Sequence, residues 1–288
     1  MTFYAFAWVA SFTYGLYAVV AKLIGKYQLK NTWQFSFFST FFAGLITSMI
    51  SLVYGATLPK NWMFVILAAL FLALGGFLYL YSLKLLDVSV MAPLFNIRVV
   101  ITVLFGYLFL GETLTPAGFW LILMVVVAGF FATMDEEFSI KSFFSKNVGF
   151  GMLFMLVLSI QSTLINRAVD QNDYWTAMLW IGLLAIPFGF LMLYPKFKND
   201  LKKSKPKDYL GVGVLSVVGG LGDLAAFKAF SGNVGVSSVI ISLPLSMVLA
   251  FLLSVFKPEL LEKHPLKVYL VRFLAAFVMI WGALQLSG

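Results

Sequence analysis

Residues 75–84, "GGFLYLYSLK", have a counterpart in residues 219–228, "GGLGDLAAFK", 144 positions further along the chain. Both stretches begin with two glycines and end with a lysine. Two other landmarks keep the same order in each half. A basic residue ends the first apolar run of each half, and "GETLTP" at 111–116 has a weaker partner in "PELLEKHP" at 258–265. Landmarks that recur in order indicate an internal duplication.

The duplicated chain is strongly apolar. Of its 288 residues, 61% are hydrophobic and 11% are charged, whereas about 25% of a typical soluble domain is charged. Apolar runs recur along the whole chain, and each is long enough to span the hydrocarbon core of a bilayer. Backbone polar groups in lipid must be paired within the protein, which favours helices. The sequence therefore predicts an all-α integral membrane protein.

Ten transmembrane helices are expected, arranged as two five-helix repeats. Residues 1–135 form the first repeat, 136–146 a polar linker and 147–288 the second repeat. Because five is odd, the second copy enters the membrane from the opposite side, which produces the inverted repeat found in many secondary transporters. The expected helices cover residues 3–24, 33–54, 62–83, 88–110, 116–133, 147–166, 174–194, 209–230, 237–256 and 265–286.

This layout resembles the EamA-type transporters of the drug/metabolite transporter superfamily. The resemblance depends on the five-plus-five helices, a short connection between the third and fourth helices, and the ending "FLGETLTP" of the fourth, and it covers essentially the whole chain. The second half departs from it, because its ninth helix ends in "FKPELL" instead of Gly-Glu. The resemblance implies a transporter of small metabolites such as amino acids, sugars or nucleobases, and not an enzyme.

The net charge of +8 is carried mainly by the connections between apolar runs. This distribution argues against nucleic-acid binding and favours contact with anionic lipid headgroups. Most lysines and arginines fall in the connections on one side, whereas the side with both termini carries Lys60, Arg167 and Lys228. The positive-inside rule then places the termini outside the cytoplasm, while the resemblance implies termini inside. We expect a multi-pass protein of the plasma membrane.

Arg98 lies near the middle of the fourth predicted helix, in "APLFNIRVVITVLFGYLFLGE" (92–112). A charge at the bilayer centre costs at least about 2.5–3.5 kcal/mol, so something must compensate for it. Asp223, in the middle of the eighth helix, is expected to face the same cavity. The two residues are either a structural ion pair that joins the halves or substrate anchors, with Arg98 for a carboxylate and Asp223 for an amine or a coupling proton. Ionisable residues inside a membrane favour the second interpretation.

Weaker candidates for the same cavity are polar or aromatic side chains within the spans. Amides in transmembrane helices commonly bond to other helices, and Trp and Tyr near span ends commonly lie at the membrane interface. The candidates are Asn96, Tyr79, Gln161, Tyr14 and Trp180. Together with Arg98 and Asp223 they predict a secondary transporter that moves an amino acid or similar zwitterion by alternating access. Its expected partners are the metabolite, membrane lipids and a coupling proton or ion.

No cofactor or metal is expected, because the sequence has no cysteine, no acid and histidine cluster with metal-ligand spacing, and no P-loop. Two other functions stay open. A lipid flippase with a cavity open sideways would have a similar sequence. "GLGD" at 220–223 matches the signature of GxGD intramembrane aspartyl proteases, which need two carboxylates. This alternative is disfavoured, because Asp87, Asp170 and Asp173 lie in linkers.

Overall fold

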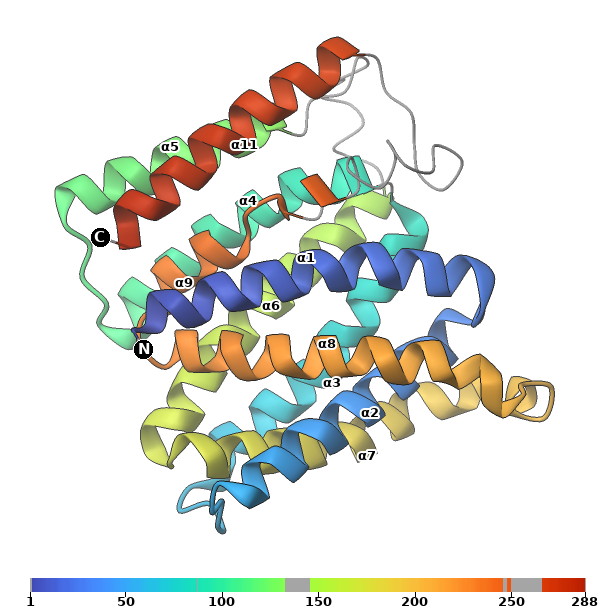
Figure 1. The fold of residues 1–288 in the computed structure, drawn as a ribbon. Helices are drawn as coiled ribbons and strands as arrows, with labels where there is room; N and C mark the ends of the chain where they lie inside the picture. Colours follow the sequence, from blue (N-terminus) through green and yellow to red (C-terminus); the bar gives the residue numbers. More distant parts are fainter. Residues whose placement is uncertain (1, 87, 133–145, 246–247, 250–265, 288) are drawn as a thin grey trace.

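The computed structural model of the chain describes residues 2–86, 88–132, 146–245, 248–249 and 266–287. Regular secondary structure in these residues is helical throughout, which confirms the all-α prediction (Figure 1). The elements are α1 (Phe3–Tyr27), α2 (Thr32–Val53), α3 (Trp62–Leu85), α4 (Val88–Phe105), the π-helical turn η1 (Gly106–Leu110), α5 (Pro116–Ala132), α6 (Lys146–Gln171), α7 (Tyr174–Leu201), α8 (Pro206–Phe230), α9 (Val234–Ile241) and α11 (Leu266–Ser287).

Length and composition identify several of these helices as membrane-spanning. Six of those described, α1, α2, α3, α6, α7 and α8, are long and apolar enough to cross a bilayer, and shorter apolar helices accompany them. Large apolar side chains are exposed on the bundle, including Leu191 at 72%, Val214 at 68% and Phe277 at 68%. Such a surface suits lipid and not water. The protein is a multi-pass membrane protein.

Some predicted segments fall outside the described residues. The polar linker predicted at 136–146 is described only at its last residue, where α6 begins. The ninth helix predicted at 237–256 is described at 237–245 and 248–249, and α9 itself ends at Ile241.

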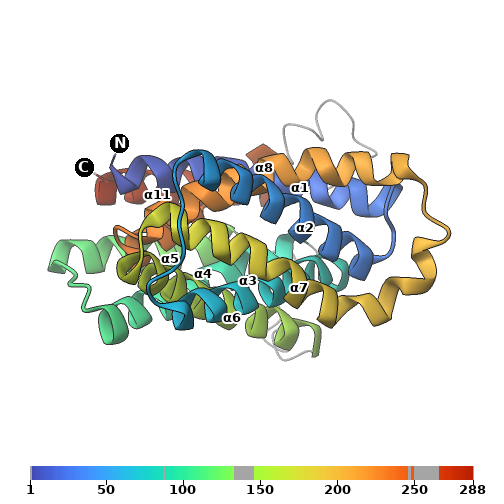
Figure 2. The ribbon, with the colours of Figure 1, turned by 90° about the horizontal axis from the view of Figure 1, so that it is seen from below.

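The helices pack in a pattern that brings the two halves of the chain together. α1 lies against α8 and α3 against α6, while α2 packs on α7, α4 on α9 and α5 on α11. In chain order, α1 to α5 of the first half correspond to α6, α7, α8, α9 and α11 of the second half. When each helix is replaced by its counterpart, the α1–α8 pair becomes the α6–α3 pair. The other three pairs each join a helix to its own counterpart. The start of α1 and the end of α11 lie at the same end of the bundle (Figures 1 and 2). The core is therefore largely an interface between the two halves.

Polar contacts beside α2 and α7 join the two halves at both ends of the bundle. At the end that holds the termini, the backbone N–H groups of Lys60 and Asn61 donate to Asn172 Oδ1 at 2.8 and 3.1 Å. At the opposite end, Asn31 Nδ2 donates to Asp200 Oδ2 at 2.5 Å. The first contact joins the connection after α2 to the connection before α7, and the second joins the connection before α2 to the last turn of α7, so both ends of this helix pair are held.

α7 is longer than the sequence predicted. A helix ending just before Pro195 was expected, followed by a polar connection, but α7 continues through this proline to Leu201. The physical reason is a buried apolar stripe that continues past Pro195 into the polar segment. Leu193 and Phe197, one turn apart, are buried, and Phe197 stacks on Phe37 of α2 with ring centroids 5.3 Å apart. Packing on α2 therefore keeps this charged segment helical.

The Gly-Glu pair at the end of the fourth predicted helix also links the halves. Gly111 follows η1 with a φ of +70°, a left-handed conformation that glycine adopts without steric cost. The Glu112 carboxylate accepts hydrogen bonds from the N–H groups of Val234 and, at 3.0 Å, of Gly235. These donors belong to the first turn of α9 and have no acceptor within that helix. A carboxylate of the first half therefore caps a helix of the second half.

α2 and α7 approach each other most closely at two glycines. A Cβ on Gly44 would lie 2.7 Å from the Gly182 carbonyl oxygen, and a Cβ on Gly182 would lie 2.8 Å from Thr47 Oγ1. Next to this crossing, Ser48 Oγ donates to the Leu179 carbonyl at 3.2 Å. Small residues of this kind let transmembrane helices pack backbone against backbone and share hydrogen bonds.

Gly44→Ala should lower the free energy of unfolding by about 1–3 kcal/mol, because the added methyl group meets backbone that cannot move aside. The matched control is Gly213→Ala on α8, where a Cβ meets nothing within 4 Å. This control should leave stability unchanged or raise it by about 0.5–1 kcal/mol, the usual advantage of alanine over glycine in a helix. Thermal unfolding of the purified variants in detergent measures both. Equal melting temperatures for the two variants would show that the glycine crossing is not tightly packed.

Candidate functional site

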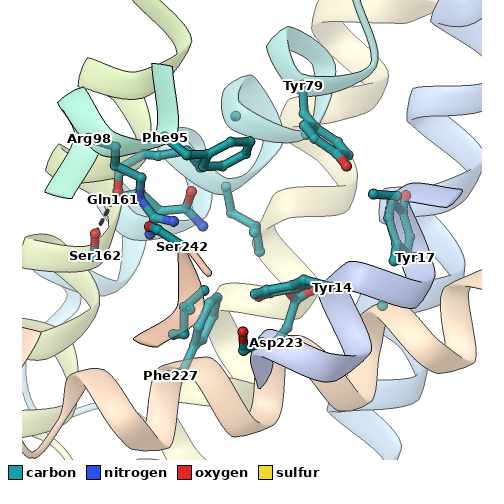
Figure 3. A pocket seen from close by; sticks show the side chains of 18 of the residues that line it. Tyr14, Tyr17, Tyr79, Phe95, Arg98, Gln161, Ser162, Asp223, Phe227 and Ser242 are labelled. Carbon is teal, nitrogen blue, oxygen red and sulfur yellow. Dashed lines mark hydrogen bonds between the residues drawn. The ribbon is translucent and has the colours of Figure 1, made fainter. Parts of the chain in front are cut away.

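A cavity of about 240 Å³ lies among the helices, at the level of the middle of most of them. Its lining is contributed by α1, α2, α3, α4, α6, α7 and α8, together with one residue of α5, the last residue of α9 and those that follow it, and one residue of α11. Both halves of the chain therefore form its wall (Figure 3). Most of the lining is apolar or aromatic, with a few polar groups that converge on the space. This composition is typical of sites for small organic molecules.

Arg98 extends into the cavity from the middle of α4 and is only 6% exposed. Its Nε atom is buried without a hydrogen-bond partner, and its guanidinium carbon lies 5.9 Å from the centroid of the Phe230 ring. Figure 3 shows the guanidinium beside Gln161 of α6. Near Arg98, Thr102 Oγ1 donates to Ser159 Oγ at 2.9 Å, which fixes α4 against α6. Helix packing thus holds the guanidinium in the cavity although its Nε donor has no acceptor.

Asp223 faces the cavity from α8 and is held by α1. Its Oδ1 accepts a hydrogen bond from Tyr14 Oη at 2.7 Å. Gly222 permits this close approach of the two helices, because a Cβ there would lie 3.0 Å from the Tyr14 ring. One turn along α1, Tyr17 Oη and Ser39 Oγ lie 2.7 Å apart and share a hydrogen bond. The α1 side of the cavity therefore presents two tyrosine hydroxyls, of which one fixes the carboxylate.

Arg98 and Asp223 line one cavity but do not bond to each other. In the described part of the chain, no Arg98 nitrogen forms an ion pair with Asp223 within 4.0 Å. Figure 3 shows the two groups on different sides of the pocket, Arg98 next to Gln161 and Asp223 next to Tyr14. The structure thus lacks the direct contact that a structural ion pair requires. Both charges instead face the space between the halves.

The weaker candidates from the sequence divide into two groups. Those in the cavity lining are Tyr14, Tyr79, Asn96 and Gln161. Trp180 is not part of the lining. Its Nε1 donates to the Thr57 carbonyl at 2.8 Å, and its ring packs edge-on against Trp62 with centroids 4.9 Å apart. It joins α7 to the connection between α2 and α3.

Several lining residues were not expected from the sequence. Among them are Tyr17, Ser39, Phe95, Phe154, Phe227 and Ser242. A chain with 31 phenylalanines and 12 tyrosines contains no signal that separates a ring facing a cavity from one facing lipid. Helix packing alone makes that distinction, so the sequence pointed to the two intramembrane charges and a few polar or tyrosine side chains but not to the phenylalanines of the lining.

Comparison with known proteins connects this architecture to a family. Residues 1–134 match the EamA-like transporter family. The match confirms, for this segment, the resemblance seen in the sequence, and EamA-like proteins are transporters rather than enzymes. No curated protein matches the chain. A crystal structure of a protein with 17% sequence identity matches with a TM-score of 0.67 over 96% of this chain and 94% of its own. The similarity in fold to this crystal structure therefore extends beyond the segment that matches the family and covers both halves of the chain.

Arg98→Met should melt at the same temperature as the wild type or higher. The substitution removes a buried donor without an acceptor, whose cost is about 1–3 kcal/mol, and keeps a similar volume. A partner of a structural ion pair would behave differently, because its loss leaves the other charge buried and costs about 3–5 kcal/mol. Thermal unfolding in detergent distinguishes the two. A large drop in melting temperature would mean that Arg98 is a structural residue.

Proposed function

We propose that this protein is a secondary transporter that moves a small organic metabolite across the plasma membrane through the central cavity by alternating access. The observation that supports the proposal is a buried cavity between the halves with a guanidinium and a carboxylate in its wall and no ion pair between them. Burying two such charges apart is costly, and a ligand that bears both opposite charges would neutralise them together.

The chemistry of the wall favours an amino acid or a similar zwitterion. Arg98 presents a planar fork of donors that can bind both oxygens of a carboxylate at once. Asp223 lies across the space and suits an ammonium group, while Phe95, Phe154 and Phe227 suit an apolar side chain. A sugar would leave both charges without a counter-charge, and a permanent cation would be repelled by Arg98. The substrate class therefore follows from having both signs of charge in one apolar cavity.

The two halves, residues 1–135 and 147–288, are proposed to be inverted five-helix repeats. The support is the packing pattern, in which α1–α8 and α3–α6 are equivalent pairs, and α2–α7, α4–α9 and α5–α11 each join matching positions. A substrate site at the interface of such repeats is accessible to either side when one half rocks against the other. The cavity lies at such an interface, because its wall comes from both halves.

Neither alternative function gains support from the described residues. An intramembrane aspartyl protease needs two carboxylates that share a proton, and Asp223 is the one acid in the described lining. A lipid flippase would need a cavity that accommodates a headgroup and opens to the bilayer. The charges of Arg98 and Asp223 on opposite walls are better explained by a small ligand with two charged ends.

The repeat arrangement predicts the sides on which two lysines lie. Lys60 precedes α3 and Lys202 follows α7, so they should be exposed on opposite sides of the membrane. The chain contains no cysteine, so Lys60→Cys and Lys202→Cys can each be labelled with a membrane-impermeant maleimide. Labelling of both from one side would contradict the inverted-repeat topology. The side from which Lys202→Cys is labelled shows the orientation of the protein. The lysine distribution predicts that this side is the cytoplasmic one.

The substrate proposal predicts that neutral amino acids raise the melting temperature of the purified protein, because a ligand of the folded state stabilises it. Arg98→Lys should abolish most of this shift and most transport, since lysine keeps the charge but loses the two-pronged geometry. The double variant Arg98→Met/Asp223→Leu should fold and not transport. Stabilisation by sugars or quaternary amines alone, or normal transport by either variant, would refute the assignment.

A further inference from the structure

We propose that Asp223 is the site of the coupling proton and that a proton and the amine of the substrate occupy it in turn, so that the protein is a proton/substrate antiporter. The inference rests on the proposed transport function and adds to it the source of energy. It is carried by the position and hydrogen bonding of one carboxylate.

Asp223 has one oxygen occupied and one available. Tyr14 Oη donates to Oδ1 at 2.7 Å, and no described residue donates to Oδ2. In the described chain no lysine or arginine lies within ion-pair distance of this carboxylate. Because the residue lines the cavity, a small ligand that enters the cavity can reach it. Carboxylates at membrane depth with this accessibility are the usual proton carriers of pumps and transporters.

The groups around Asp223 leave it as the single acid of the site. The described lining contains no histidine, lysine or glutamate. The other ionisable side chains near the site come from four neighbouring helices. Tyr14 and Tyr17 on α1, Tyr79 on α3 and Arg98 on α4 line the cavity, and Tyr174 at the start of α7 donates to the carbonyl of Leu224, next to Asp223 in α8. Tyrosines and arginine keep one protonation state near neutral pH. Among these side chains, a proton that enters the cavity from water can therefore bind only at Asp223.

Competition for this carboxylate couples the movement of the proton to the movement of the substrate. When a proton binds, an O–H bond forms at Asp223 and one breaks in a hydronium ion, and no electron is transferred. The neutral carboxyl no longer attracts the ammonium group of the substrate, which leaves. Arg98 stays charged throughout, so the carboxylate anchor persists and the proton acts only on the amine anchor. Because proton and substrate exclude each other, they move in opposite directions.

The first test needs no substrate. Infrared difference spectra of the purified protein between about pH 5 and about pH 9 report the carbonyl stretch of each carboxyl group that titrates. Asp223→Asn should remove one band, and Tyr14→Phe should change the frequency of that same band, because it removes the hydrogen bond to Oδ1. The matched control is Asp170→Asn at the exposed end of α6, which should leave the band in place. Spectra of Asp223→Asn identical to the wild type would overturn the inference.

The second test measures coupling in proteoliposomes with the membrane potential set to zero by potassium and valinomycin. The probe is a mixture of radiolabelled neutral L-amino acids. An interior more acidic by one pH unit should drive substrate accumulation of up to about tenfold. One proton exchanges for one substrate molecule, so a tenfold ratio of proton concentrations is balanced by a tenfold ratio of substrate concentrations. Asp223→Asn should show no response to the gradient, and Asp170→Asn should respond like the wild type.

The outcomes separate the two proposals. Exchange of amino acids that is unaffected by the pH gradient in the wild type would refute proton coupling and leave the transport function standing. Absence of both exchange and accumulation in the wild type would refute the proposed substrate class, and the infrared test would still decide whether Asp223 binds a proton.

Discussion

Arg98 brings a positive charge into the middle of the bundle, where it is 6% exposed and its Nε has no acceptor. The ring of Phe230, whose centroid is 5.9 Å from the guanidinium carbon, offers a weak electrostatic contact that cannot replace hydration. The structure keeps this charge from Asp223 by using a different partner for the carboxylate, the hydroxyl of Tyr14. Two opposite charges stay available in one cavity because each is fixed by its own helices. The proposed chemistry depends on this separation.

The two charges stay apart because contacts between the two halves of the chain hold their helices in place. α4 is fixed to α6 through Thr102 and Ser159, whereas α8 is fixed to α1 through Tyr14. These are contacts between the halves, so any movement of one half against the other must involve them. The Glu112 cap of α9 is another such contact, at the end of the bundle that holds the termini. The cavity wall and the interface between the halves are thus the same surface.

The glycine pairs that first indicated a duplication have comparable roles in the structure. A Cβ on Gly75 would lie 3.1 Å from Gln161 Oε1 of α6, and a Cβ on Gly219 would lie 2.9 Å from the Tyr17 ring of α1. Each glycine lets its helix approach a helix of the other half beside the cavity. Four positions after each, the halves differ, with Tyr79 in α3 and Asp223 in α8. The two helices therefore pack in the same way, but only α8 contributes a carboxylate to the cavity at this position.

The all-helical membrane class and the resemblance to EamA-type transporters could be predicted from the residues alone, because hydrophobic runs of bilayer length and helix-end motifs are local signals. The sequence also singled out Arg98 and Asp223, since charges at membrane depth are rare and conspicuous. It did not determine the end of α7, where burial of Phe197 extends the helix, or the place of Trp180 outside the cavity. It left open whether the two charges bond, because that depends on how α1, α4, α6 and α8 pack. Only the tertiary structure decides which of many similar aromatic side chains face one another across a cavity.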